Sequence, residues 1–91
     1  MKKEHILKLD MSFCQDVYTG NKSFEVRMSD RNYGVGDIVR FQPVDKDKNS
    51  CRHPIENNTY EITYVLDPKT IKDNCFVGLE DGWVVFGIKE T

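Results

Sequence analysis

MSFCQDVYTGNKSFEVRM, residues 11–28, contains a helix signal followed directly by a strand signal. Apolar residues in the first half recur at the spacing of one helix face: Met11, Cys14, Val17 and Tyr18. Ser12 with Gln15 three residues later predicts a capping box at the start of this helix. Gly20 suits the left-handed residue that ends it.

The second half of this stretch alternates between apolar and polar residues. Phe24, Val26 and Met28 fall on one side, and Glu25 and Arg27 fall on the other. The pattern predicts a half-buried strand over residues 23–28, with a polar face made of functional groups.

Strand signals surround this unit on both sides. We expect strands at residues 5–9, 37–44, 59–66 and 83–88. Pro43 should end its strand or place it at a sheet edge. In residues 59–66 the alternation places Tyr60, Ile62, Tyr64 and Leu66 on one side. The final strand is almost wholly apolar and should lie in the middle of the core, whereas residues 69–79 fit either a helical turn or a short strand.

The order of elements predicts an α+β fold that is mainly β. No helix pattern connects the later strands, so a small β-barrel with one early helix packed beside it is favoured over a parallel α/β sheet. The 91 residues suffice for one domain, 1–91, with a polar loop at about 45–58. The helix should cover one side of the barrel.

Composition narrows the class of partner. The chain carries 13 Lys and Arg against 15 Asp and Glu, a net charge of −2, so it lacks the cationic excess of proteins that coat nucleic acids. A polyanion would have to meet a local basic cluster, and a small ligand in a pocket fits equally well. The 38% hydrophobic content without a long apolar run predicts no membrane span.

The cysteines favour a reducing compartment. Cys14, Cys51 and Cys75 are odd in number and widely spaced, unlike the paired set of a disulfide-stapled secreted domain. The opening MKKEHILKLD also lacks the apolar stretch of a signal peptide. We therefore expect a cytoplasmic protein with reduced thiols.

Candidate functional residues gather around the predicted strand at 23–28. Glu25 and Arg27 project from one face, and Lys22 lies beside the helix C-terminus. The alternative is structural, since Glu25 and Arg27 would also suit exposed ion pairs with neighbouring strands, which contribute only about 0–1 kcal/mol each.

Several segments in this order resemble an ASCH domain, a branch of the PUA-like superfamily. The segments are YTGNKSFEVR (18–27), DR (30–31), VGDI (35–38), ITYVL (62–66) and GLEDGWVVFGI (78–88), with EHILKL (4–9) fitting the first strand. The resemblance is greatest to the short stand-alone members of bacteria and phages, and it covers most of the chain apart from the polar loop. It implies a small β-barrel with a polar cleft between the helix, the Lys22 loop and the strand that carries Glu25 and Arg27.

The resemblance also implies a ligand, because in this family the cleft is the presumed site for RNA or a modified nucleoside. The positions that carry over are Lys22, Glu25 and Arg27, with Asp30 and Arg31 as a second tier. Lys and Arg can hold a phosphate, while a carboxylate can accept a hydrogen bond from a base amino group. Tyr33, in the turn that follows, is a candidate for an exposed stacking ring.

An enzymatic function is the second hypothesis. Some ASCH proteins are amidohydrolases that remove an acyl group from a modified cytidine with a lysine, a threonine and a later glutamate. Lys22 matches the lysine, Glu25 stands at the threonine position, and Glu61 matches the later glutamate by character only. A carboxylate in place of a hydroxyl nucleophile changes the mechanism, so the balance is against an enzyme.

Other motifs have simpler explanations. Cys51-Arg52-His53 lacks the second ligand pair of a structural zinc site, so we expect a solvated loop there, with neither metal nor cofactor. The rings of Trp83, Phe86, Tyr60 and Tyr64 could stack on bases, but they lie within apolar runs, so packing in the core is favoured. A protein-interaction module, in which the same charges contact a protein partner, is the third hypothesis.

Overall fold

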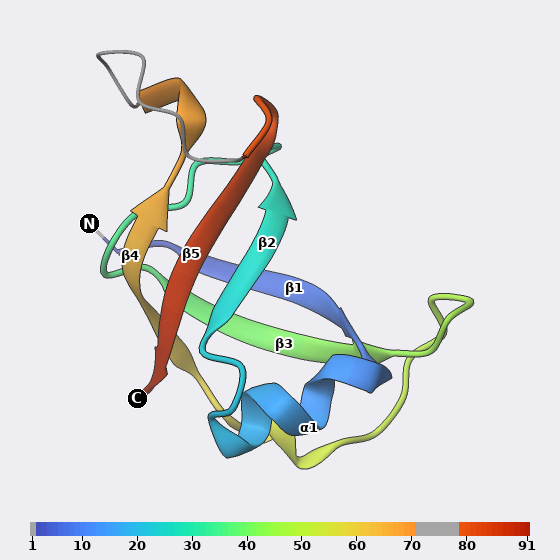
Figure 1. Ribbon diagram of the computed structural model, residues 1–91. Coiled ribbons are helices and arrows are strands. Elements are labelled where there is room, and N and C mark those ends of the chain that lie inside the picture. Colours follow the sequence, from blue (N-terminus) through green and yellow to red (C-terminus); the bar gives the residue numbers. More distant parts are fainter. Residues whose placement is uncertain (1, 71–78) are drawn as a thin grey trace.

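Five strands form one curled sheet in the computed structural model, which describes residues 2–70 and 79–91. The strands are β1 (Glu4–Asp10), β2 (Phe24–Met28), β3 (Ile38–Val44), β4 (Tyr60–Leu66) and β5 (Trp83–Glu90). Their hydrogen-bonded order is β1-β3-β4-β5-β2, with β1 parallel to β3 and the other neighbours antiparallel. The sheet curls into an open half-barrel (Figure 1), which confirms the predicted α+β, mainly β class.

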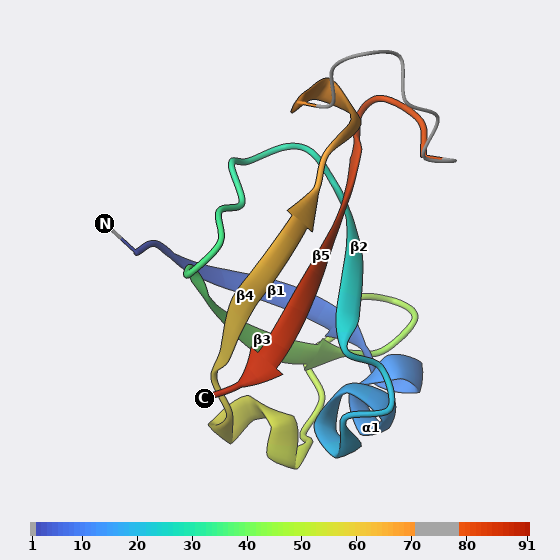
Figure 2. The ribbon, with the colours of Figure 1, turned by 60° about the vertical axis from the view of Figure 1, so that its left-hand side comes forward.

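One helix, α1 (Met11–Thr19), lies across one end of the half-barrel (Figure 2). Gly20 ends it in the left-handed conformation, with φ 87°, as predicted. The predicted start is wrong, because Asp10 and not Ser12 is the N-cap, and its carboxylate accepts a hydrogen bond from the Ser12 N–H. A carboxylate two residues earlier is an equally good cap and also joins β1 to the helix without a loop.

The core fills the concave side of the sheet and the space beneath α1. Its fully buried members include Cys14 and Val17 from the helix and Phe86 from β5. Burial in this core raises the pKa of the Cys14 thiol to about 11. β5 lies between β4 and β2 and buries Val84, Phe86 and Ile88, which agrees with its predicted place in the core.

A β-bulge in β4 changes which side chains face the core. The pairing with β5 shifts between Ile62 and Tyr64, so Thr63 is the additional residue on β4. Tyr64 and Leu66 therefore turn to the outer face, while Val65 packs against the core. The predicted alternation, with Tyr64 among core residues, is wrong from the bulge onward, whereas Tyr60 and Ile62 are buried as expected.

The polar loop at 45–58 is partly structured. It contains a short 3-10 helix, η1 (Pro54–Asn57), whose Ile55 is fully buried in the core. His53 caps this helix by accepting the Ile55 N–H at Nδ1, so its side chain is not simply solvated. Pro43 is the last residue but one of β3, which agrees with the prediction that it ends its strand, whereas β3 itself lies between β1 and β4 and is not a sheet edge.

A second 3-10 helix, η2 (Pro68–Thr70), follows β4, so a helical turn does begin in the ambiguous segment. Residues 71–78, with Cys75, lie outside the described part of the chain. Within the described part, the helices are too short and too polar to span a bilayer.

Candidate functional site

The strand β2 presents its charged side to the interior of the half-barrel. Glu25 is only 3% exposed, whereas Phe24, Val26 and Met28 are 44%, 47% and 60% exposed on the outer side. The predicted alternation is correct, but the half-buried strand buries its polar face and not its apolar one. Burial of a carboxylate is tolerated because two cations contact it, so no lone charge is left in the interior.

A cavity of about 670 Å³ opens between β1 and β2, the two ends of the sheet order. Its wall includes residues 7–10 of β1, Phe13 of α1, Lys22 and all five residues of β2. Successive strand residues point to opposite faces, so a cavity bordered by five in a row must follow the edge of β2 that faces away from β5. The candidate site is therefore the opening of the half-barrel.

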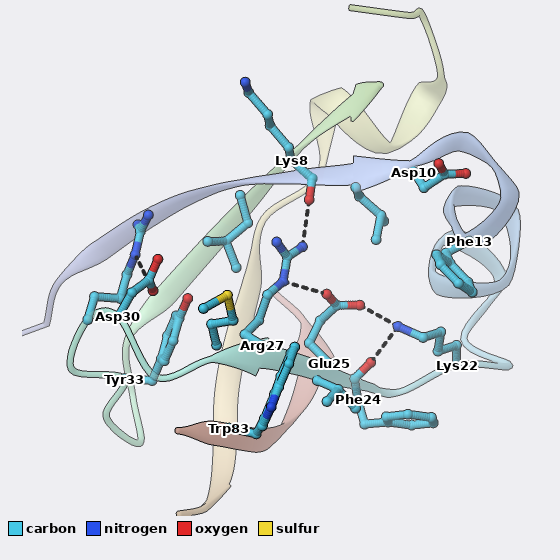
Figure 3. Close-up of a pocket in the computed structure, with 15 residues that line it drawn as sticks. Lys8, Asp10, Phe13, Lys22, Phe24, Glu25, Arg27, Asp30, Tyr33 and Trp83 are labelled. Carbon is cyan, nitrogen blue, oxygen red and sulfur yellow. Dashed lines mark hydrogen bonds and ion pairs between the residues drawn. The ribbon is translucent and has the colours of Figure 1, made fainter. Parts of the chain in front are cut away.

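Glu25 is the centre of a three-charge cluster in this cavity. One carboxylate oxygen pairs with the ammonium group of Lys22, and the other accepts a hydrogen bond of 2.9 Å from Arg27 Nε (Figure 3). About a fifth of each cationic side chain is exposed, so both reach the cavity while Glu25 stays behind them. The cluster carries a formal charge of +1.

Arg27 also connects the two edges of the half-barrel. Its Nη2 donates a hydrogen bond of 2.7 Å to the carbonyl oxygen of Lys8 on β1 (Figure 3). Odd-numbered residues of β1 point their main-chain groups toward β3, as the bond from Ile38 N to Lys3 O shows. The Lys8 carbonyl therefore points away from β3. The side chain of Arg27 donates the hydrogen bond that a neighbouring strand would otherwise supply.

Lys22 is held by main-chain and aromatic contacts as well as by Glu25. Its ammonium nitrogen donates to the carbonyl oxygen of Phe24 at 3.0 Å. The same nitrogen lies 5.2 Å from the ring centroid of Phe13 and 5.1 Å from that of Phe24. Cation–π contacts at these distances fix the ammonium without removing its charge.

The second-tier candidates line the same cavity. Asp30 and Arg31 are exposed and form a loose pair of 3.9 Å between Asp30 Oδ1 and Arg31 Nε. Tyr33 borders the cavity too, but it is half-buried and not an exposed ring. Burial raises the pKa of its phenol.

Tyr33 is positioned through His5 by a second buried carboxylate, Asp37. Its ring packs at 4.8 Å, centroid to centroid, from His5 and at 4.7 Å from Phe86. His5 Nε2 donates to Asp37 at 2.8 Å, and Asp37 also accepts the N–H groups of Lys3 and Gly34. The turn that carries Tyr33 is therefore anchored to the start of β1.

The sequence reasoning missed two aromatic residues of the site, Phe13 and Phe24, and favoured the core for a third, Trp83. Phe13 and Phe24 flank Lys22, and Trp83 borders the cavity near the end of β2 (Figure 3). Trp83 is 41% exposed, so its predicted place in the core is wrong. Phe24 faces outward because β2 buries its charged side, and the alternation of residues alone does not show which side of a strand is buried.

The site combines one net positive charge, several N–H donors and aromatic rings around an open cavity. Such a set can hold a planar polar ligand by stacking and hydrogen bonding, with at most a few ionic contacts. No curated protein matches the chain. Residues 4–88 match the family model described as "Domain of unknown function (DUF3850)", and the chain belongs to this family.

Proposed function

We propose that the protein binds a nucleoside unit, either as a free modified nucleoside or within a short single-stranded RNA, in the cavity between β1 and β2. The observation that carries the proposal is the Lys22–Glu25–Arg27 cluster, which brings two hydrogen-bond donors and one acceptor to one open cavity. The resemblance to ASCH domains points to the same ligand class.

The polar groups of the cluster suit the edges of a base and one phosphate. The guanidinium of Arg27 and the ammonium of Lys22 retain N–H groups beyond those that Glu25 uses, and they can donate to base or phosphate oxygens. Glu25 can accept from a base amino group if the ligand displaces one of its cations. Ligand binding then exchanges partners within the cluster.

The aromatic residues at the cavity supply the apolar part of recognition. Trp83, Phe24 and Tyr33 border it from three separate segments. Every base has a π-face, and stacking on an aromatic ring contributes about 1–3 kcal/mol per base. The cavity has room for one base and its neighbours. A ligand of that size agrees with the net negative charge of the protein, which disfavours coating of a long nucleic-acid strand.

Fluorescence titration tests the proposal directly, because the chain has a single tryptophan and it borders the cavity. We expect quenching of Trp83 by short single-stranded RNAs or by free modified nucleosides, and these two arms separate the ligand sources. Lys22→Ala and Arg27→Ala should weaken binding about tenfold or more, since each removes a charge-assisted hydrogen bond.

Arg52→Ala is the matched control, because Arg52 is an exposed arginine that pairs with Glu56 outside the cavity. Its affinity should equal that of the unaltered protein. Equal affinity of all four proteins, or no quenching in either arm, would refute the proposal. For RNA, the salt slope should stay near −0.7 to −1.4, the value for one or two phosphate contacts.

The enzymatic alternative has less support. Glu25, at the position of the threonine nucleophile, is buried and engaged by two cations, and Lys22 is engaged as a hydrogen-bond donor. Hydrolysis of an acylated cytidine by the purified protein, lost in Lys22→Ala, would reverse this preference.

A further inference from the structure

A second cavity, of about 320 Å³, lies beside the candidate site. The turn at residues 29–35 forms one of its walls, and the end of β4 with the residues that follow it forms another. Arg31 and Tyr33 border both this second cavity and the first cavity, the one between β1 and β2. The two cavities are therefore neighbours that share part of a wall.

Tyr33 is a fixed part of that shared wall. Its ring contacts His5 and Phe86, which are 4% and 0% exposed. His5 is held in turn by the buried carboxylate of Asp37. Tyr33 and Lys22 lie at opposite ends of the first cavity (Figure 3). A ligand that extends from Lys22 along the first cavity therefore reaches the second cavity at the far end, across Tyr33.

The second cavity has the composition of a site for a base. Val65 is half-buried and Val84 is buried, and together they supply an apolar surface. Hydroxyl, amide and carboxylate side chains border it as well: Ser29, Asn32, Asp67 and Thr70. Such groups can both donate to and accept from the edge of a base. The volume lies at the lower end of the range of small-ligand pockets, about 300–1,000 Å³.

Arg31 places a cation at the boundary between the two cavities. Its side chain is 44% exposed, and its pair with Asp30 spans 3.9 Å, which is too long for a hydrogen bond. That pair therefore uses none of the five N–H donors of the guanidinium. Lys69 adds positive charge at the turn, because its Nζ donates to Ser29 Oγ at 3.4 Å. The fork of N–H groups on an arginine matches the oxygens of a phosphate.

The order of these features matches one step of a nucleic-acid strand. Successive bases of a strand are joined through sugars and one anionic phosphate, so the groups follow the order base, phosphate, base. Across the protein, the order is first cavity, Arg31, second cavity. A free nucleoside in the first cavity would use neither Arg31 nor the second cavity, whereas a second nucleotide uses both.

We propose that the second cavity is the subsite for the adjacent nucleotide of a single-stranded RNA, with the linking phosphate at Arg31. The inference rests on the proposed function, because the first nucleotide occupies the first cavity. It selects RNA over a free nucleoside as the ligand. Two nucleotides joined by one phosphate suffice to fill both cavities.

Titration with dinucleotides tests the inference through the fluorescence of Trp83, which borders the first cavity. The ligands are ApA, CpC, GpG and UpU, each compared with its nucleoside and with the nucleoside 3′- and 5′-monophosphates, together with free modified nucleosides. We expect at least one dinucleotide to bind about tenfold or more tightly than its nucleoside and both monophosphates. The second base adds apolar contact and hydrogen bonds that none of these smaller ligands can make.

Two variants address the second subsite. Arg31→Ala should weaken dinucleotide binding about tenfold, since it removes a charge-assisted hydrogen bond to the phosphate. Asn32→Leu should also weaken dinucleotide binding but leave nucleoside binding unchanged, because among the described residues Asn32 borders the second cavity and not the first. Arg40→Ala is the matched control. Arg40 lies on β3, is 46% exposed and pairs with Glu4, so both affinities should equal those of the unaltered protein.

A dinucleotide with an uncharged linkage tests the position of the phosphate. A methyl group in place of one non-bridging phosphate oxygen removes the negative charge and keeps both bases. The unaltered protein should bind this analogue about tenfold more weakly than the natural dinucleotide, whereas Arg31→Ala should bind the two alike. An equal loss in both proteins would place the phosphate at another cation and overturn the assignment to Arg31.

The titrations also separate this inference from the proposed function. If nucleosides quench Trp83 but no dinucleotide binds more tightly than its monophosphates, the second subsite is refuted and the proposed function stands. If none of the ligands quenches Trp83, both are refuted. Dinucleotide binding that is unaffected by both Arg31→Ala and Asn32→Leu would likewise overturn the second subsite.

Discussion

Glu25 and Asp37 are both buried carboxylates, 3% and 6% exposed, but they differ in what holds them. Asp37 accepts hydrogen bonds from two main-chain N–H groups and from Nε2 of the His5 ring. Glu25 accepts from two long side chains, Lys22 and Arg27, which border the open cavity.

The difference separates a structural anion from one that a ligand can address. Main-chain donors are fixed by the fold, so the partners of Asp37 change only if the turn before β3 moves. Lys22 and Arg27 donate through side chains, so a ligand can take over these contacts without a change in the main chain, and the two carry one more positive charge than Glu25 neutralises. In these two buried clusters, the kind of donor, main chain or side chain, thus separates the structural anion from the one that a ligand can reach.

Removal of the Glu25 carboxylate should have the largest effect on stability. Glu25→Ala leaves Lys22 and Arg27 close together without their anion, and loss of one member of a buried ion pair costs about 3–5 kcal/mol. Because both cations are partly exposed, we expect a value near 3 kcal/mol in urea denaturation.

Glu4→Ala is the control for that measurement, because Glu4 forms an exposed pair of 3.4 Å with Arg40. It should cost less than about 1 kcal/mol. If the two variants lose equal stability, Glu25 is not the anchor of the cluster.

Asp37→Asn should have an intermediate, pH-dependent effect. Burial raises the pKa of Asp37, but hydrogen bonds from His5 and from the Lys3 and Gly34 N–H groups outweigh it and leave the pKa below 3.8. A lowered folded-state pKa stabilises the fold above pH 3.8, and that contribution is lost as the pH falls through the folded-state value.

At pH 7 we therefore expect Asp37→Asn to lose about 2 kcal/mol, and this difference should shrink below pH 4. Urea denaturation across the acid range measures it, with the exposed Asp16→Asn as control. A difference that is independent of pH would show that the charge of Asp37 contributes little.

Arg27→Lys should have the smallest effect on stability. Lysine keeps the charge beside Glu25 but cannot contact Glu25 and the Lys8 carbonyl in the same fork geometry, so about 1 kcal/mol should be lost. Ligand affinity should fall further than stability does. Equal retention of both would mean that the bridge to β1 has no role in the site.

The sequence predicts the elements well because their signals are local. The helix and the strand β2 follow from the spacing of their apolar residues, and the end of the helix follows from Gly20, because glycine tolerates the positive φ found there. The six candidate residues of the site also border one cavity, because most of them lie on β2 or on the turns beside it.

Three features escape local reasoning because they depend on distant partners. The burial of Glu25 requires the curl of the sheet over it, which no alternation of residues reveals. The bulge at Thr63 appears only in the pairing of β4 with β5. Ile55 reaches the core from a polar segment because η1 packs beneath the sheet.

The position of β2 at the end of the sheet has a consequence during synthesis. Its neighbour within the described sheet is β5, so a ribosome must continue from Met28 to at least Trp83 before β2 gains that neighbour. Until then its apolar side chains and unpaired main chain remain available to other nascent chains. Translation speed through the intervening segment should therefore influence the yield of folded protein, because pairing over such a separation is slow.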